Sequence, residues 1–178
     1  MKKIIFLFAV FCSSLLWSQE FEVGNMIPEY GKTFEVKDPG FKTDTTSELK
    51  IVFDINRTFN PVETNQLIET AARFLNMHEK AGVDPKNMKV AVVLHGRAVN
   101  DALKNEFYTK KNPDATINPT IPLIDALSEK GVEIILCGQS AAYHKVSKEK
   151  ADENVIFSLS ALTALVQLQN DGYQLIKF

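Results

Sequence analysis

The residues best suited to chemistry in this sequence surround Cys137. Residues 132–136 are mostly apolar and partly β-branched, as in a buried strand, and the cysteine follows them directly. Gly138, Gln139 and Ser140 then lead into a helix-like stretch. A thiol at such a junction lies beneath the free N–H groups of the helix. Those donors and the helix dipole favour thiolate over thiol, so Cys137 is a candidate nucleophile.

Other polar residues follow the remaining apolar runs. Asn56, His95 and Ser158 each end or follow one of them. In open α/β sheets, ligands bind outside the carboxyl ends of the strands. His95 could take a proton from Cys137 if their two strands are adjacent, so these two residues are the candidate catalytic pair. The candidate ligand-binding residues are Asn56, Gly138, Gln139 and Ser140.

Each candidate also has a structural interpretation. Free cysteine is among the most buried residue types, so Cys137 could pack as a small apolar residue. His95 could be a strand-end histidine satisfied by backbone groups. Asn56 and Ser158 are common turn and capping residues. The pattern alone leaves both interpretations open.

Several other chemistries find no support. Cys137 and the histidines at 78, 95 and 144 lack the spacing of metal ligands, so no metal site is expected. The segment after Cys137 is not a phosphate-binding loop, and there is no Gly-x-Ser-x-Gly elbow for a serine hydrolase. No cofactor is predicted.

The first 19 residues have the pattern of a secretory signal. Lys2 and Lys3 precede an apolar run at residues 4–11, and small residues stand near Ser18. The run is too short to span a bilayer comfortably, so stable membrane insertion is not expected. Attachment through a lipid on Cys12 is an alternative, but the bulky Phe11 disfavours it. The pattern predicts an exported, periplasmic protein in which Cys137 has no intramolecular partner after cleavage.

Composition and charge fit one folded domain of ordinary size. The chain has 178 residues and a formal net charge of −2, which becomes −4 once Lys2 and Lys3 are removed. No run of basic residues with interleaved aromatic residues is present, so a nucleic-acid partner is not expected.

Apolar strand-like runs alternate with helix-like segments over residues 49–178. Strands are predicted at 50–55, 89–94, 132–136, 154–158 and 173–178, and helices at 63–80, 99–108, 119–130, 140–150 and 160–170. This alternation predicts a three-layer α/β/α sandwich with a mostly parallel sheet of about five strands. Residues 20–48 are polar and aperiodic, which indicates an N-terminal arm with one short strand at 32–36.

The same segments resemble the DsrE/DsrF-like family, whose members include the sulfur-relay subunit TusD. The likeness covers roughly residues 49–178 and is clearest at Gly131-Val-Glu-Ile-Ile-Leu-Cys137 and in the ending from Ser158 to Phe178. The resemblance implies a flavodoxin-like fold that assembles into trimers or hexamers. It also implies a cysteine at the position of Cys137 that carries a persulfide and hands its sulfur to a thiol or sulfur-carrier partner.

Two features depart from the relay members of that family. They work in the cytoplasm, whereas this chain carries an export signal, and the arm at residues 20–48 is foreign to the small relay subunits. The sequence therefore supports an exported protein that binds or relays sulfane sulfur through Cys137. The alternatives are a non-catalytic oligomeric domain that binds a small ligand, with Cys137 structural, and a redox sensor that forms a mixed disulfide.

Overall fold

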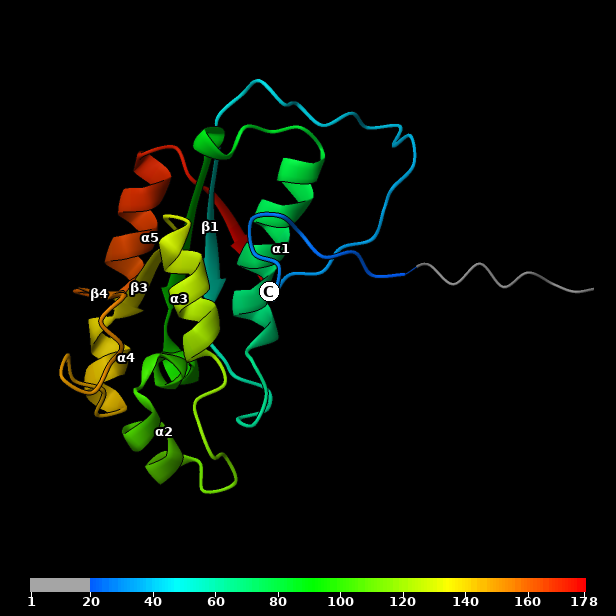
Figure 1. The fold of residues 1–178 in the computed structure, drawn as a ribbon. Helices are drawn as coiled ribbons and strands as arrows, with labels where there is room; N and C mark the ends of the chain where they lie inside the picture. Colours follow the sequence, from blue (N-terminus) through cyan, green and yellow to red (C-terminus); the bar gives the residue numbers. More distant parts are fainter. Residues whose placement is uncertain (1–19) are drawn as a thin grey trace, which may run out of the picture.

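The structure, a computed structural model, describes residues 20–178, so the predicted signal sequence at 1–19 lies outside the described residues. Its centre is a five-stranded sheet in the order β4-β3-β2-β1-β5, and every neighbouring pair is parallel (Figure 1). The strands are β1 (Leu49–Ile55), β2 (Met88–Leu94), β3 (Glu133–Cys137), β4 (Val155–Ser158) and β5 (Gln174–Lys177).

Helices cover both faces of the sheet, which confirms the predicted three-layer α/β/α architecture. The α-helices are α1 (Gln66–Lys80), α2 (Asn105–Lys111), α3 (Ile121–Glu129), α4 (Gly138–Tyr143) and α5 (Ala161–Asn170). Helices α1 and α3 lie on one face, and α5 lies on the other (Figure 1). Helix α5 carries the chain from β4 at one edge of the sheet to β5 at the opposite edge. Among residues 20–178, no helix has both the length and the apolar character needed to cross a membrane.

The predicted strands are found close to their expected bounds, and the apolar runs of β1, β2 and β3 are largely buried. In β2, Val92 faces the α1 and α3 side, while Ala91 and Val93 face α5, and all three are fully buried. A central strand covered on both sides needs such a continuous apolar run. The edge strand β5 is exposed throughout, and its position beside β1 could not be derived from sequence.

The predicted helix at 99–108 is wrong. The chain forms a 3-10 helix, η2 (Gly96–Ala102), and α2 begins only at Asn105. The break follows from tertiary contacts: Leu103 pairs with Ala151 in an isolated bridge, and the Lys104 amide donates to the Lys150 carbonyl at 2.9 Å. The predicted helix at 140–150 is also different. It begins at Gly138 and ends at Tyr143, just before Lys145, which has a positive φ of 57°.

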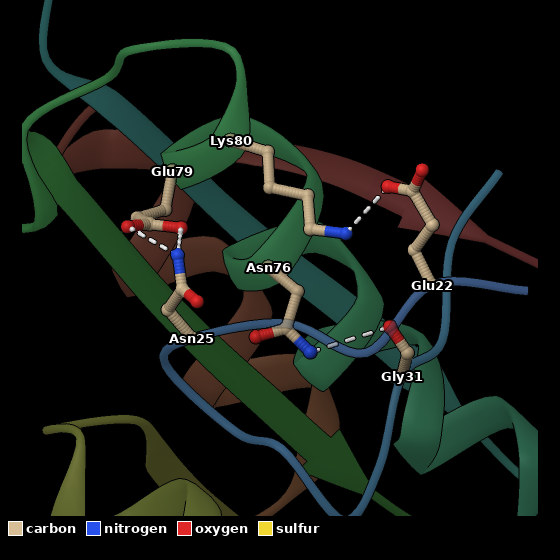
Figure 2. A network of polar contacts seen from close by, with 6 residues as sticks. All are labelled: Glu22, Asn25, Gly31, Asn76, Glu79 and Lys80. Carbon is tan, nitrogen blue, oxygen red and sulfur yellow. Dashed lines mark hydrogen bonds and ion pairs between the residues drawn. The ribbon is translucent and has the colours of Figure 1, made fainter. Parts of the chain in front are cut away.

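The arm packs against α1 through the buried side chain of Asn76 (Figure 2). The Asn76 Oδ1 accepts from the Ile27 amide at 2.9 Å, and Nδ2 donates to the carbonyls of Ile27, Tyr30 and Gly31 at 3.0, 2.9 and 3.3 Å. Ile27 itself enters the core beneath these bonds. The predicted strand at 32–36 is reduced to a single bridge between Glu22 and Thr33.

Two exposed polar contacts extend the same attachment along α1. Lys80 lies 2.8 Å from Glu22, and Asn25 Nδ2 donates to both carboxylate oxygens of Glu79 at 3.2 and 3.1 Å (Figure 2). These contacts therefore join arm and helix along the last turn of α1, from Asn76 to Lys80.

Candidate functional site at the carboxyl edge of the sheet

Cys137 is both the last residue of β3 and the N-cap of α4. Its sulfur accepts a hydrogen bond from the Ser140 amide at 3.5 Å. The residue is 5% exposed and packs in the apolar cluster between the sheet and α5, beside Ile135 and Ala161. The sulfur therefore has the capped position that the sequence predicted, but it is nearly covered by its neighbours.

Burial and hydrogen bonding act in opposite directions on the Cys137 thiol. Burial alone raises its pKa, because it disfavours the charged thiolate. The Ser140 hydroxyl and the amides of Ser140, Ala161 and Gln139 donate toward the sulfur, and together they outweigh burial, so the pKa is lowered. The Ala161 amide opens α5, so the sulfur meets the N-terminal ends of two helices. Such donors stabilise an anion at that point.

Gly138 and Ser140 hold the turn that creates this position. A Cβ at residue 138 would lie 2.5 Å from the Ser158 carbonyl oxygen, so only glycine lets β3 and β4 approach so closely. The Ser140 hydroxyl accepts from the Gly96 amide at 3.0 Å, which ties α4 to the end of β2. Gln139 is peripheral, because its side chain reaches only the Leu159 carbonyl, at 3.5 Å.

The structure places His95 directly after β2 and Cys137 at the end of β3, and these two strands are adjacent. Leu94 pairs with Leu136, so the next residues of β2 and β3 are neighbours in register. The imidazole of His95, however, contacts Asp54: Nε2 lies 2.8 Å from Oδ1, without the alignment of a hydrogen bond. The backbone of His95 thus lies beside that of Cys137, while its imidazole ring contacts the Asp54 carboxylate.

Asp54 was missed from sequence as a site residue. It is the penultimate residue of β1, it is 6% exposed, and its Oδ2 lies 3.5 Å from Lys177 Nζ on β5. Asp54 and Lys177 are paired in register and so share one face of the sheet. Because side chains alternate along a strand, Asp54 and Phe53 are expected on opposite faces of the sheet. No sequence pattern, however, links Asp54 to Lys177. The result is a buried carboxylate that lies between the His95 imidazole and the Lys177 ammonium group.

Asn56 contributes through its backbone. Its carbonyl accepts from the Arg97 amide at 3.1 Å, and its side chain is exposed. The same carbonyl explains Gly96, since a Cβ there would lie 2.7 Å from it and φ is +53°. The predicted ligand-binding role of the Asn56 side chain stays a prediction.

A separate cavity of about 210 Å³ lies beyond the carboxyl ends of β1 and β2. Its lining includes Phe59, Arg97, Asp101 and Tyr108. The buried Asp101 carboxylate accepts through Oδ2 from Thr58 Oγ1 and Asn65 Nδ2, both at 2.6 Å, and its Oδ1 has no hydrogen-bond partner. No sequence signal marked this cavity.

The side chains that could bind a metal ion do not gather into a metal centre in the described residues. Within the described part of the chain, no group of three or more His, Cys, Asp and Glu side chains is arranged to hold a metal ion. The chemistry available at this edge is that of a single hydrogen-bonded thiol with a nearby imidazole–carboxylate pair.

These features define an α/β/α protein with an anion-stabilised cysteine at the carboxyl edge of a parallel sheet. The model of the DsrE/DsrF-like family matches residues 50–178, and the chain belongs to this family. The family predicted from the sequence is thereby confirmed.

Two solved structures share the fold. The protein of unknown function MTH1491 from Methanobacterium thermoautotrophicum is 18% identical, with a TM-score of 0.51. The YchN protein from E. coli is also 18% identical, with a TM-score of 0.53. In both cases the match covers 73% of this chain and 99% of the other. No curated protein matches this sequence significantly.

Proposed function

We propose that this protein binds and relays sulfane sulfur through a persulfide on Cys137. The observation that carries the proposal is the set of donors around the sulfur: one hydroxyl and three amides that lower the pKa of a buried thiol. An inert core cysteine needs no such arrangement. Membership in the DsrE/DsrF-like family supports a sulfur-relay-like role.

The proposed chemistry has two displacement steps. The Cys137 thiolate attacks the terminal sulfur of a polysulfide, the sulfur–sulfur bond breaks, and the shortened polysulfide leaves with the electron pair. An acceptor thiolate then attacks the outer sulfur of the Cys137 persulfide, and the Cys137 thiolate is the leaving group. The donors at the ends of α4 and α5 stabilise the anion before the first step and again after the second. His95 would serve as a proton carrier at the edge of the site.

The experiment is intact-mass analysis of the purified protein after incubation with polysulfide. Wild type should gain the mass of one sulfur atom and lose it on addition of a thiol. Cys137→Ser should gain nothing while keeping its fold. Absence of added sulfur on the wild-type protein would refute the relay.

Export and assembly belong to the same proposal. The N-terminal pattern at residues 1–19 supports export, which N-terminal sequencing of the protein from its own compartment would test. Assembly into a homo-oligomer is supported by an apolar surface on and beside α5. Its members are Ile156, Leu159, Leu162 and Val166, which are 53%, 72%, 78% and 56% exposed. Exposed apolar clusters of this kind often mark contacts between subunits. Sedimentation of wild type and Leu162→Asp would test it, since the variant should be monomeric.

One observation favours a second function, that of a small-ligand-binding domain. The cavity beside Asp101 is open to a ligand, whereas Cys137 is nearly covered. In that case Cys137 would be a packing residue. Its alkylation would then require denaturant, and its apparent pKa would be about 8.5 or higher, the range of an unperturbed thiol.

A further inference from the structure

Two distant segments bring together a cluster of cations, here called the basic surface. Its members are Arg97, Lys104, Lys110, Lys111, Lys145, Lys148 and Lys150. Residues 97–111 and 144–150 are joined by the Leu103–Ala151 bridge and by the amide of Lys104 bonded to the carbonyl of Lys150. Sequence alone shows no basic run, because the two halves are more than 30 residues apart.

Several cations of the basic surface contact neutral groups, and Lys110 and Lys150 lie over the Phe107 ring. Lys111 Nζ donates to Asn100 Oδ1 at 2.8 Å and to the His144 carbonyl. Lys104 Nζ donates to the Glu149 carbonyl at 3.1 Å. Within residues 20–178, none of the seven has a carboxylate at ion-pair distance. Their charges are therefore available to a partner.

Like charges crowd one another here. Burial is the main cause that lowers the pKa of Lys111, and Lys150 and Lys145 lower it further. The pKa of His144 is lowered by burial first, and then by Lys111 and Arg97. The two segments also contain three acids, of which Asp101 is buried, while Glu106 and Glu149 are exposed. The surface is thus locally positive on a chain whose net charge is −2.

The basic surface lies at the far end of the helix that Cys137 caps. Helix α4 has six residues, with Cys137 as its N-cap and His144 as its C-cap. At 1.5 Å per residue, the two ends are about 9 Å apart. A partner seated on the lysines would have the thiol within reach of a short segment.

We propose that the basic surface docks an acidic segment of the protein that exchanges sulfur with Cys137; this inference rests on the proposed function. Complementary charge would steer that partner and raise its rate of encounter. A protein partner fits better than a nucleic acid, since six of the seven cations are lysine, whereas arginine is the preferred phosphate ligand. The negative charge of the rest of the chain would also repel a long polyanion or an anionic membrane.

The first test measures binding without sulfur chemistry. A fluorescent oligoglutamate peptide is titrated with wild type, with the triple variant Lys110→Glu, Lys145→Glu, Lys148→Glu, and with a matched control. The control, Lys86→Glu, Lys89→Glu, Lys130→Glu, changes the net charge equally at exposed positions by the amino ends of β2 and β3. We expect salt-sensitive binding that is at least about tenfold weaker in the first variant and nearly unchanged in the control.

Three outcomes overturn the docking proposal: no salt-sensitive binding to wild type, equal loss in both triple variants, or tighter binding of single-stranded DNA or anionic vesicles at the same salt. Because this titration does not involve Cys137, its result is independent of whether the protein carries sulfur.

The second test uses the loaded protein. Wild type with a persulfide on Cys137 is mixed with cysteine peptides flanked by glutamate or by lysine. Sulfur transfer to the acidic peptide should be faster, and the Lys110/Lys145/Lys148 triple variant should lose that preference. Loading without any preference overturns the docking proposal and leaves the relay intact. Failure to load refutes the relay, and the titration then tests only whether the basic surface binds an acidic segment.

Discussion

Gly138 lies against Ser158, so closely that a methyl group on residue 138 would reach within 2.5 Å of the Ser158 carbonyl oxygen. This contact sets the distance between β3 and β4 at the point where Cys137 ends its strand. The position of the sulfur therefore depends on a residue with no reactive group of its own.

Gly138→Ala should destabilise the protein by about 1–3 kcal/mol, because the new methyl group must displace backbone. Urea unfolding would measure the loss. Gly40→Ala is the control: nothing lies within 4 Å of a Cβ there, so its effect should stay within about 0.5 kcal/mol. Equal effects in the two variants would contradict the close approach.

Ser140→Ala should raise the pKa of Cys137, because the thiolate loses its hydroxyl donor. A higher pKa means less thiolate at neutral pH, so alkylation should slow by on the order of two- to tenfold. The rate is followed with iodoacetamide across pH. Ser147→Ala, whose hydroxyl bonds Glu149 instead, should leave the pH profile unchanged. An unaltered profile in Ser140→Ala would show that the hydroxyl does not act on the sulfur.

Asp101 should make stability depend on pH. Burial raises its pKa to about 6 from the ordinary 3.8, against the opposing hydrogen bonds from Thr58 and Asn65. A raised folded pKa means that the folded protein holds the proton more tightly than the unfolded chain does. The resulting stability is complete below about pH 4 and is lost as pH rises through 6.

Asp101→Asn removes this dependence, because the amide does not ionise. As pH rises from 4 to 7.5, the free energy of unfolding of the variant should increase relative to that of wild type by on the order of 2–3 kcal/mol. Urea unfolding of both proteins at the two pH values measures the difference. Parallel pH profiles would rule out a buried, titrating Asp101.

Asn76→Ala should release the arm from α1. Four hydrogen bonds are lost and the Ile27 amide is left without its acceptor. The free energy of unfolding should therefore fall by about 2–4 kcal/mol. Hydrogen exchange at residues 22–33 should accelerate more than exchange in β2. Gln66→Ala, at an exposed position on the same helix, is the control. Unchanged protection of the arm would mean that other contacts hold it.

The architecture could be predicted from sequence because each central strand is a continuous apolar run. The division into layers follows from that pattern, but the place of β5 does not, since Gln174–Lys177 is exposed and carries no burial signal. The helix predicted at 99–108 is interrupted at Leu103 and Lys104, which pair with Ala151 and Lys150, residues far away in the chain.

The candidate site was predictable only in part. Cys137 could be recognised because strand, cysteine, glycine and helix follow one another locally. The contact of His95 with Asp54 and the second helix end at Ala161 depend on strand order and on the path of α5. The basic surface likewise needs two segments that only the fold brings together.

The attachment of the arm has a consequence for quaternary structure. Residues 22–33 pack on α1 and so cover part of that helix. The buried Asn76 side chain holds them there by hydrogen bonds to the backbone of the arm. The opposite side, where α5 lies over the sheet, exposes Leu159, Leu162 and Val166. Subunits that meet there would keep residues 22–33 of every arm on the outside of the assembly.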